Sequence, residues 1–300
     1  MDENFIKIFP QKIIRALDNY LQDNTLQEIR IKINRPVIAI SSKGEIVSSI
    51  ITDSEDVKYI LQRISNYSLY AYEEEIKQGF ITIKGGHRVG LAGECVMENG
   101  KLKTIRNISS LNIRICRQVI GCSREVIKHI FSEDKVYNTL IISPPKCGKT
   151  TILRDIARVI SASGRKVSIV DERSEIAACY MGVPQLDVGI RSDVLDNCLK
   201  SEGMMMAIRS LSPDVIISDE IGTLKDIEAL LMAFNSGVNI IATLHGASME
   251  DLYKRKVFND LFENNILERV IVLSNRNGVG TIESIYSILK GGEKKCLKLS

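Results

Sequence analysis

The chain has 300 residues, of which 44% are hydrophobic and 26% are charged, and its formal net charge is +3. These values are ordinary for a globular protein and carry no charge excess that would indicate nucleic-acid binding. No apolar run reaches membrane-spanning length, and residues 1–5 lack the basic-then-apolar layout of a signal peptide. We therefore expect a cytoplasmic protein of two domains without a transmembrane segment.

Residues 1–134 predict a small α+β domain. Helical spacing of apolar residues predicts helices at 11–23, 54–66 and 68–78 and a connecting helix at 123–131. Ser54 is the expected cap of the second helix. Alternation of apolar and polar residues predicts strands at 26–33, 37–40, 80–84, 87–97, 101–106 and 110–117. A polar linker at 132–135 separates this domain from the rest of the chain.

Residues 135–300 alternate between strand and helix patterns. Strands are predicted at 137–142, 167–171, 215–218 and 239–243, and helices at 149–162, 194–211 and 224–235. A hairpin of two strands, roughly 268–273 and 281–289, closes the chain. Four parallel-type strands with intervening helices predict a three-layer α/β fold of the P-loop NTPase class, RecA-like or AAA-like.

A phosphate-binding loop lies at the start of this second domain. Residues 143–150 read S-x-x-x-x-G-K-T between a predicted strand and a predicted helix, which is the context that this motif requires. Its backbone N–H groups would hold the triphosphate of ATP. The expected ATP-binding residues are Ser143, Pro144, Pro145, Lys146, Cys147, Gly148, Lys149, Thr150 and Thr151.

Four positions of the loop have particular interpretations. Lys149 would reach the β- and γ-phosphates, and the Thr150 hydroxyl would ligate Mg²⁺. Ser143 departs from the pattern, which has Gly there, and Ser tolerates a left-handed backbone less well. Cys147 lies at a helix N-terminus, where a thiolate is favoured, so a redox function and an ordinary small-residue role are both open; the second is favoured. The scattered cysteines and three histidines do not favour a zinc site.

Acidic residues follow two other strands of the second domain. Asp219 and Glu220 come directly after strand 215–218, and parallel strands present their carboxyl ends at the ligand-binding edge of a sheet. Asp219 is the expected second magnesium ligand, and Glu220 the base that deprotonates the attacking water. Asp171 ends strand 167–171, and Glu172 follows it directly. Because sequential strands usually neighbour each other, Glu172 is expected beside the phosphate loop, where it would position water or metal.

Three further residues are candidates for catalysis. His245 follows strand 239–243 and would sense the γ-phosphate, although a structural histidine is the better interpretation of that residue alone. Arg191 and Arg209 are expected near the same edge, where either could stabilise transition-state charge. Arg209 has the stronger case because it precedes the strand that carries Asp219.

These boxes in this order resemble the Walker A, acidic, Walker B and histidine boxes of type II and type IV secretion ATPases. Three longer segments, Gly79 to Gly93, Arg106 to Ile115 and Gly189 to Met206, resemble the stage III sporulation protein AA family. The resemblance extends from about Leu26 to about Tyr286.

That resemblance implies a mother-cell ATPase of the channel joining mother cell and forespore. It implies a homo-oligomeric ring, a hexamer, at the cytoplasmic face of membrane-protein partners from that channel. It also implies that ATP binds between the two domains and that an N-terminal arginine closes on the phosphates. Four arginines match that region: Arg88, Arg106, Arg114 and Arg117.

Two other functions stay open on the sequence. The first is a nucleotide-dependent assembly module with little hydrolysis, which intact Lys149, Asp219 and Glu220 disfavour. The second is a nucleic-acid-stimulated NTPase, for which residues 84–88 together with Arg114, Arg117 and Arg124 would supply cations. The balanced charge and the lack of an aromatic stacking stripe argue against nucleic acid.

Overall fold

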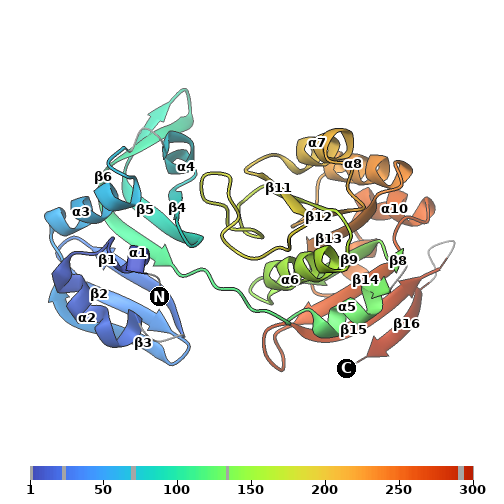
Figure 1. Ribbon diagram of the computed structural model, residues 1–300, viewed down its shortest axis with the longest axis horizontal. Helices are drawn as coiled ribbons and strands as arrows, with labels where there is room; N and C mark the ends of the chain where they lie inside the picture. The colour runs from blue at the N-terminus through green and yellow to red at the C-terminus, as the bar shows by residue number, and fades with distance from the viewer. Residues whose placement is uncertain (1–2, 22–24, 69–71, 133–134, 290–293, 300) are drawn as a thin grey trace. The chain divides into compact units, whose positions relative to one another are not determined.

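The computed structural model describes residues 3–21, 25–68, 72–132, 135–289 and 294–299. The contacts divide the chain into two units (Figure 1). The first comprises Met1–Arg117 together with Ala178–Leu186, and the second comprises Gln118–Ala177 and Asp187–Ser300. The first unit therefore takes in a short segment from the middle of the chain. The predicted domain boundary between residues 134 and 135 stays a prediction.

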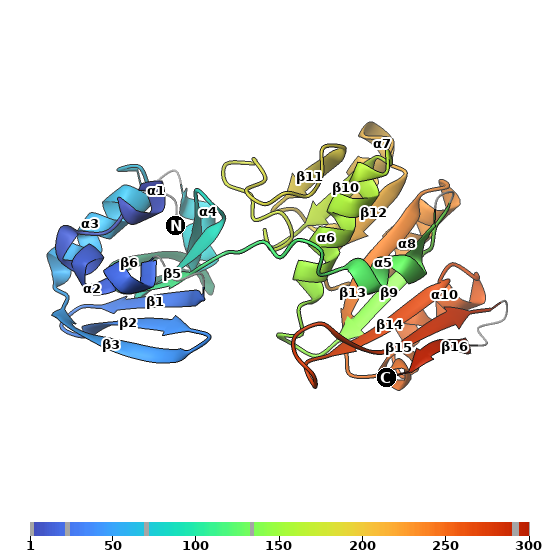
Figure 2. The ribbon, with the colours of Figure 1, turned by 60° about the horizontal axis from the view of Figure 1, so that its bottom comes forward.

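The first unit is built on a six-stranded antiparallel sheet with the order β3-β2-β1-β6-β5-β4. Apolar residues of the strands and helices form one buried cluster, and the helices gather on one face of the sheet (Figure 2). Burial alternates along β1 because only one face packs on that core. The strands are β1 (Leu26–Lys32), β2 (Pro36–Ser41), β3 (Gly44–Ile51), β4 (Phe80–Ile83), β5 (His87–Glu98) and β6 (Lys101–Arg114). The helices are α1 (Glu3–Ile6), α2 (Gln11–Leu21), α3 (Ser54–Ile64) and α4 (Glu73–Lys77).

Several sequence predictions for this unit need correction. The sheet contains β3, which was not predicted, and the two strands expected at 101–106 and 110–117 are the single strand β6. Helix α3 is capped by Asp53 and not by Ser54, because Asp53 and Asp56 form a reciprocal capping box. Residues 22–23 and 69–71 of two predicted helices, and 133–134 of the predicted linker, lie outside the described residues.

The second unit is built on an eight-stranded sheet with the order β11-β10-β12-β13-β9-β14-β15-β16. The first six strands of that order run parallel, and β14–β16 form an antiparallel extension. The strands are β9 (Thr139–Ser143), β10 (Val167–Asp171), β11 (Ser192–Asp196), β12 (Val215–Ser218), β13 (Asn239–His245), β14 (Arg269–Ser274), β15 (Thr281–Ile288) and β16 (Lys294–Leu299). A separate pair, β7 (Phe131–Ser132) and β8 (Lys135–Val136), precedes them.

Helices cover both faces of the parallel sheet, which confirms the predicted three-layer α/β fold (Figure 2). Strands β9 and β10 are buried at every position because both faces are covered. Helices α7 and α8 share a core with alternate strand residues such as Leu140 and Val170, and α6 packs on the other face. The helices are α5 (Arg124–Ile130), α6 (Lys149–Ala162), α7 (Lys200–Ser210), α8 (Leu224–Asn235), α9 (Met249–Tyr253), the 3₁₀ turn η2 (Lys256–Phe258) and α10 (Asn259–Glu263).

The largest error in this unit concerns residues 192–211. The sequence predicts one helix from 194, whereas the structure has the edge strand β11 followed by helix α7. An edge strand that is only half-buried lacks the continuous apolar run of the central strands, so its pattern resembles helical spacing. Within the part of the chain that the structure describes, no helix combines the length and apolar character that a bilayer crossing requires.

Candidate nucleotide-binding site

The phosphate loop joins β9 to α6, as its motif predicts. Ser143 ends β9, is fully buried, and donates its hydroxyl to the Pro144 carbonyl at 2.9 Å. The left-handed residues of the loop are Lys146 (φ 60°) and Gly148 (φ 80°), and Ser143 is not among them. The departure from the motif at Ser143 therefore does not place serine in the backbone conformation that favours glycine.

Lys149 and Cys147 of the loop have backbone partners. The Lys149 ammonium donates to the carbonyl oxygens of Ser143 at 3.0 Å and Pro144 at 3.2 Å. It therefore contacts the backbone of the same loop that would bind a phosphate. Cys147 is buried, with its sulfur 3.5 Å from the Pro145 carbonyl. Such burial suits the small-residue role of Cys147.

The loop meets the acidic strand end through a side-chain contact. The Thr150 hydroxyl donates to Asp219 Oδ2 at 2.9 Å, across a sheet in which β9 and β12 are separated only by β13. Thr243 of β13 lies between them: its hydroxyl donates to Asp219 and accepts the Glu220 N–H at 2.8 Å. Thr243 is fully buried and was not predicted; its place two residues before His245 on a strand that ends at this edge is the signal that could have found it.

The donor set at Thr150 and Asp219 fits a magnesium ion that arrives with its nucleotide. A hydroxyl and a carboxylate are hard oxygen ligands, and Mg²⁺ is usually held by one or two carboxylates together with substrate phosphates and waters. Among the described residues, no group of three or more His, Cys, Asp or Glu side chains is placed to hold a metal ion.

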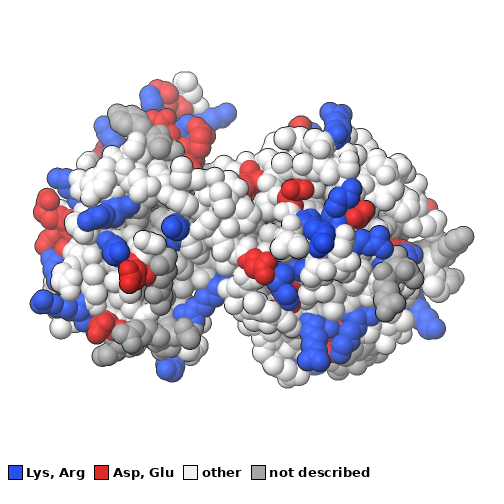
Figure 3. Space-filling view, in the orientation of Figure 1, with Lys and Arg blue, Asp and Glu red and all other residues white. Residues whose placement is uncertain are grey.

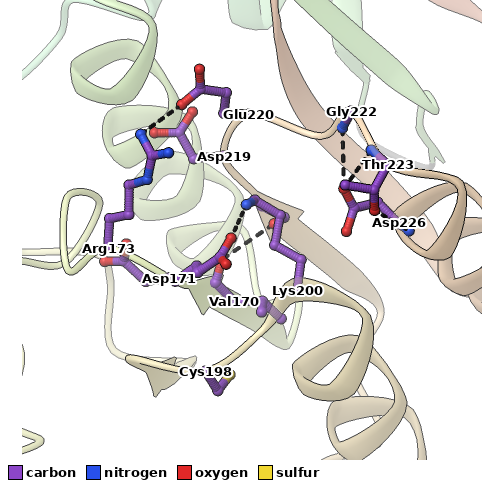
Figure 4. A network of polar contacts seen from close by, with 12 residues as sticks. Val170, Asp171, Arg173, Cys198, Lys200, Asp219, Glu220, Gly222, Thr223 and Asp226 are labelled. Carbon is purple, nitrogen blue, oxygen red and sulfur yellow. Dashed lines mark hydrogen bonds and ion pairs between the residues drawn. The ribbon is translucent and has the colours of Figure 1, made fainter. Parts of the chain in front are cut away.

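The two candidate glutamates each have a cationic partner. Glu220 lies 3.1 Å from Arg173 (Figure 4), in a pair whose side chains are 47% and 67% exposed, respectively. A pair so exposed contributes only about 0–1 kcal/mol. Glu172 is paired with Lys200, whose side chain is only 12% exposed. Neither Arg173 nor Lys200 was predicted to lie at the site.

The expected position of Glu172 is wrong. Strands β12 and β13 separate β10 from β9, so three strand spacings, about 14 Å, lie between the end of β10 and the phosphate loop. The rule that sequential strands are neighbours fails here because a P-loop sheet inserts later strands beside its first one. Glu172 follows β10, and Glu220 follows the adjacent strand β12. Glu172 is therefore a neighbour of Glu220 along the carboxyl edge and not of the phosphate loop.

The Asp171 side chain accepts hydrogen bonds from the backbone at this edge. Its carboxylate accepts the N–H groups of Glu175, Ile176 and Ala177 at 2.8–2.9 Å. Burial raises the pKa of Asp171 to about 6, the three backbone hydrogen bonds oppose the rise, and the charge of Asp196 on the neighbouring strand adds to it. Asp171 therefore shapes the segment that follows Glu172.

His245 lies beside the phosphate loop. It ends β13 in register with Ser143, and its imidazole is exposed. Its backbone carbonyl accepts a hydrogen bond from Arg255 at 2.7 Å. This placement is compatible with the predicted sensing of phosphate, which stays a prediction.

Arg191 and Arg209 lie at the opposite edge of the sheet, so the expectation that they flank the phosphate site of their own chain is wrong. Arg191 immediately precedes β11, and its carbonyl accepts the N–H of Val167 at the start of β10. Arg209 is near the C-terminal end of α7, which runs back from the carboxyl edge of the strands. A helix between two parallel strands necessarily ends where the next strand begins.

The four N-terminal arginines belong to the first unit. The Arg88 guanidinium lies 4.0 Å from the centroid of the Phe80 ring, Arg106 pairs with Glu94 at 3.2 Å, and Arg117 donates to the Leu26 carbonyl at 2.6 Å. Arg114 is opposite Arg88 on the neighbouring strand β5. Which of them approaches a nucleotide stays a prediction.

The parallel sheet with its phosphate loop, together with an N-terminal antiparallel sheet, defines a P-loop protein of the secretion-ATPase fold. The pilus retraction motor PilT with bound ADP superimposes with a TM-score of 0.61, at 15% identity, over 95% of this chain and 81% of that chain. The ATPase DotB of Legionella pneumophila gives a TM-score of 0.60, at 16% identity, over 96% of this chain and 80% of that one.

The chain belongs to the family described as “Sporulation stage III, protein AA”, which matches residues 1–293. It is 46% identical over 288 residues to stage III sporulation protein AA of Bacillus subtilis, and the match covers 93% of each chain. A more distant relative, the uncharacterized protein ycf45 of Porphyra purpurea, is 27% identical over 86% of this chain and 43% of its own length. The family resemblance expected from the three long segments is thereby confirmed.

Proposed function

We propose that this protein is an ATPase that binds and hydrolyses MgATP and uses the cycle to drive a channel or secretion complex during endospore formation. The observation that carries the proposal is the hydrogen bond between Thr150 of the phosphate loop and Asp219 of the acidic strand end. That contact brings together the two groups that a magnesium-bound triphosphate needs.

The chemistry divides among the residues of the carboxyl edge. The loop N–H groups and Lys149 bind the phosphates, and Thr150 with Asp219 holds the magnesium of the substrate. Glu220 orients a water and takes its proton as the water oxygen attacks the γ-phosphorus and the bond to the β–γ bridging oxygen breaks. Thr243 positions Asp219 and Glu220 through two hydrogen bonds. Departure of the γ-phosphate would be reported through His245.

The family of the chain supports the setting of this activity. Bacillus subtilis stage III sporulation protein AA is a sporulation protein by its name, and DotB and PilT are named an ATPase and a motor. We infer that this chain acts as a homo-oligomeric ring, a hexamer, peripheral to the membrane through membrane-protein partners. The cytoplasmic, mother-cell side of the forespore membrane is the proposed location.

One observation favours the alternative of an assembly module that binds ATP and barely hydrolyses it. Glu220 is engaged by Arg173, and this ion pair occupies the carboxylate that would take the proton of the attacking water. The pair is too exposed to hold Glu220 strongly, so hydrolysis stays the preferred function. For nucleic acid, Figure 3 shows Lys and Arg interspersed with Asp and Glu over the described residues of the face in view, which does not favour a phosphate-tracking surface.

Turnover of ATP by the wild-type chain and by Glu220→Gln tests the proposal. We expect the substitution to retain ATP binding and to reduce the rate by about 10²- to 10⁴-fold, the usual contribution of a general base. Equal, near-zero rates for both proteins, with ATP bound by both, would leave the assembly module as the function. A rate that rises with added DNA or RNA and falls steeply with salt would instead revive the nucleic-acid alternative.

A further inference from the structure

A cavity of the first unit is lined by residues of α1, the end of α3 and β4. Its volume is about 290 Å³, and part of its lining is apolar and buried: Phe5, Ile64 and Ile83. The segment Ala178–Leu186 belongs to the same unit and adds Tyr180 to the lining. Four segments distant in sequence therefore meet around one small space, whose volume is close to the lower limit for ligand pockets.

The described residues that line this cavity include three cations and no carboxylate. The cations are Lys7, which follows α1, Arg63 in the last turn of α3, and Lys84, which follows β4. All three residues are exposed, whereas the apolar lining is buried, so the cations form the rim of the cavity. Like charges held around one space repel one another, and an anion bound between them removes that repulsion.

The cations of the rim are only weakly neutralised by the described residues. The Lys7 ammonium lies 3.4 Å from Glu3, in a pair whose side chains are both largely exposed, and exposed pairs of this kind are weak. Arg63 donates to the neutral hydroxyl of Tyr59 at 3.3 Å, and its guanidinium lies over the Tyr59 ring. Within the described part of the chain, Lys84 forms no ion pair. The rim therefore keeps a positive charge that an anion could neutralise.

Hydrogen-bonding groups lie beside the cations. Asn66 and Tyr67 follow α3 with left-handed backbones, at φ values of 48° and 62°. This conformation is costly for a side chain as bulky as tyrosine, and strained backbone is concentrated at ligand sites. The Asn66 amide donates to the Tyr180 hydroxyl at 3.1 Å. Because Tyr180 accepts this bond, its own proton stays available to the Tyr72 hydroxyl, 3.5 Å away, or to a ligand.

We propose that this cavity binds the phosphate group of a small organic phosphate, with Lys7, Arg63 and Lys84 as its cationic ligands. Arginine binds phosphate oxygens through paired N–H donors, and lysine binds them as a point charge. The apolar lining receives the organic part of the ligand. A soluble phosphate ester and a phospholipid headgroup both carry this group, and the volume of the cavity suits a ligand of the size of glycerol phosphate.

The proposed site is separate from the nucleotide site. Its described lining belongs to the first unit, whereas the phosphate loop belongs to the second. His87 and Val89 of β5 are buried on the face of the sheet that the helices cover, and the His87 ring lies 4.5 Å from the Phe5 ring, centroid to centroid. Because side chains alternate across a strand, Arg88 and its cross-strand neighbour Arg114 belong to the opposite face. These two arginines are therefore not part of the cavity.

Calorimetric titration of the full chain with glycerol 3-phosphate tests the proposal. Arg63→Gln is expected to weaken binding about tenfold or more, the effect of losing one charged hydrogen-bonded contact. Lys84→Gln, on a different element, should give a loss of similar size, so the result does not depend on one variant. Lys58→Gln, a lysine of the same helix α3 whose side chain is 64% exposed, is the matched control and should bind like the wild type. Lys149→Ala should also bind like the wild type, because the phosphate loop is not the site.

Sedimentation with phosphatidylcholine vesicles, prepared with and without phosphatidic acid, identifies the source of the phosphate. Binding to phosphatidic acid that Arg63→Gln removes assigns a lipid headgroup, and binding to glycerol 3-phosphate that Arg63→Gln removes assigns a soluble ester. Absence of binding to both probes would overturn the proposal. Affinities that Arg63→Gln and Lys84→Gln leave unchanged would also overturn it. A loss that Lys149→Ala reproduces would do the same, since the ligand would then lie in the phosphate loop.

Discussion

The two edges of the parallel sheet in the second unit both carry polar and charged side chains, but these side chains have different partners. At the carboxyl edge, Thr150, Asp219 and Thr243 contact one another across three strands. At the amino edge, Arg191 donates to the backbone of Ser161. The direction of the parallel strands causes this difference. The C-terminal ends of the strands, and the loops that follow them, lie together at the carboxyl edge, whereas the N-terminal ends of the strands lie at the amino edge. The distance of a residue from a motif along the sequence therefore does not decide whether the residue lies at the site; the direction of its helix or strand does.

Removal of the loop lysine should have the largest effect. Lys149→Ala is expected to weaken MgATP binding by about 30- to 1,000-fold, the cost of truncating one partner of a charged hydrogen-bonded contact. The measurement is calorimetric titration with MgATP. Lys166→Ala, an exposed lysine at the amino edge, is the matched control and should bind like the wild type. Equal losses in both variants would mean that the two edges do not differ.

The buried Asp171 predicts a pH-dependent stability. Its folded pKa of about 6 is above the ordinary value of 3.8, so the folded chain holds its proton more tightly. This contribution to stability is present below about pH 4 and is lost as pH rises through about 6, and it amounts to about 3 kcal/mol at 1.36 kcal/mol per pKa unit. Urea denaturation of wild type and Asp171→Asn across this range measures it.

In Asp171→Asn the fall in stability between pH 4 and 7 should largely disappear. Asp214→Asn, at the amino edge, should keep the fall, because Asp171 is unchanged in that variant. A wild-type stability that rises across this range would contradict the assignment to Asp171.

Thr243 should have a smaller effect on the rate. Thr243→Val leaves Asp219 and the Glu220 N–H without their shared partner, at a cost of about 1–3 kcal/mol, so a fall in kcat of about tenfold is expected. Steady-state kinetics would show the fall in kcat with little change in KM. Thr139→Val provides the amino-edge control, since this threonine is also buried and donates to the Tyr137 carbonyl at 2.6 Å. The control should change stability and leave kcat unchanged.

Arg209 should have the smallest effect. Arg209→Ala is expected to change ATP affinity and kcat by no more than about twofold, as for most exposed positions. Binding and turnover measured on the same preparation test this expectation. A large fall in kcat with unchanged affinity would show that the amino edge takes part in catalysis, and the contrast between the two edges would then fail.

The sequence alone determined the elements that carry strong local signals. Helix α6 and strands β10 and β12 have the predicted bounds, because a central parallel strand is apolar throughout and a P-loop helix starts at its G-K-T. Long matching segments also gave the family. Half-buried β11 gave no such signal, and neither did the solvent-facing strand β3.

Only the tertiary structure decided which residues meet at the site. The order in which strands pair depends on contacts distant in sequence, so the separation of Glu172 from the loop and the pairing of Arg173 with Glu220 had no local signal. The same holds for Thr243, an ordinary strand residue until β13 is placed between β9 and β12. The residue types that a phosphate site requires are set by its chemistry, so they could be predicted from sequence motifs. Which side chains lie next to them depends on the order of the strands in the sheet. That order is determined by the burial of apolar residues throughout the unit.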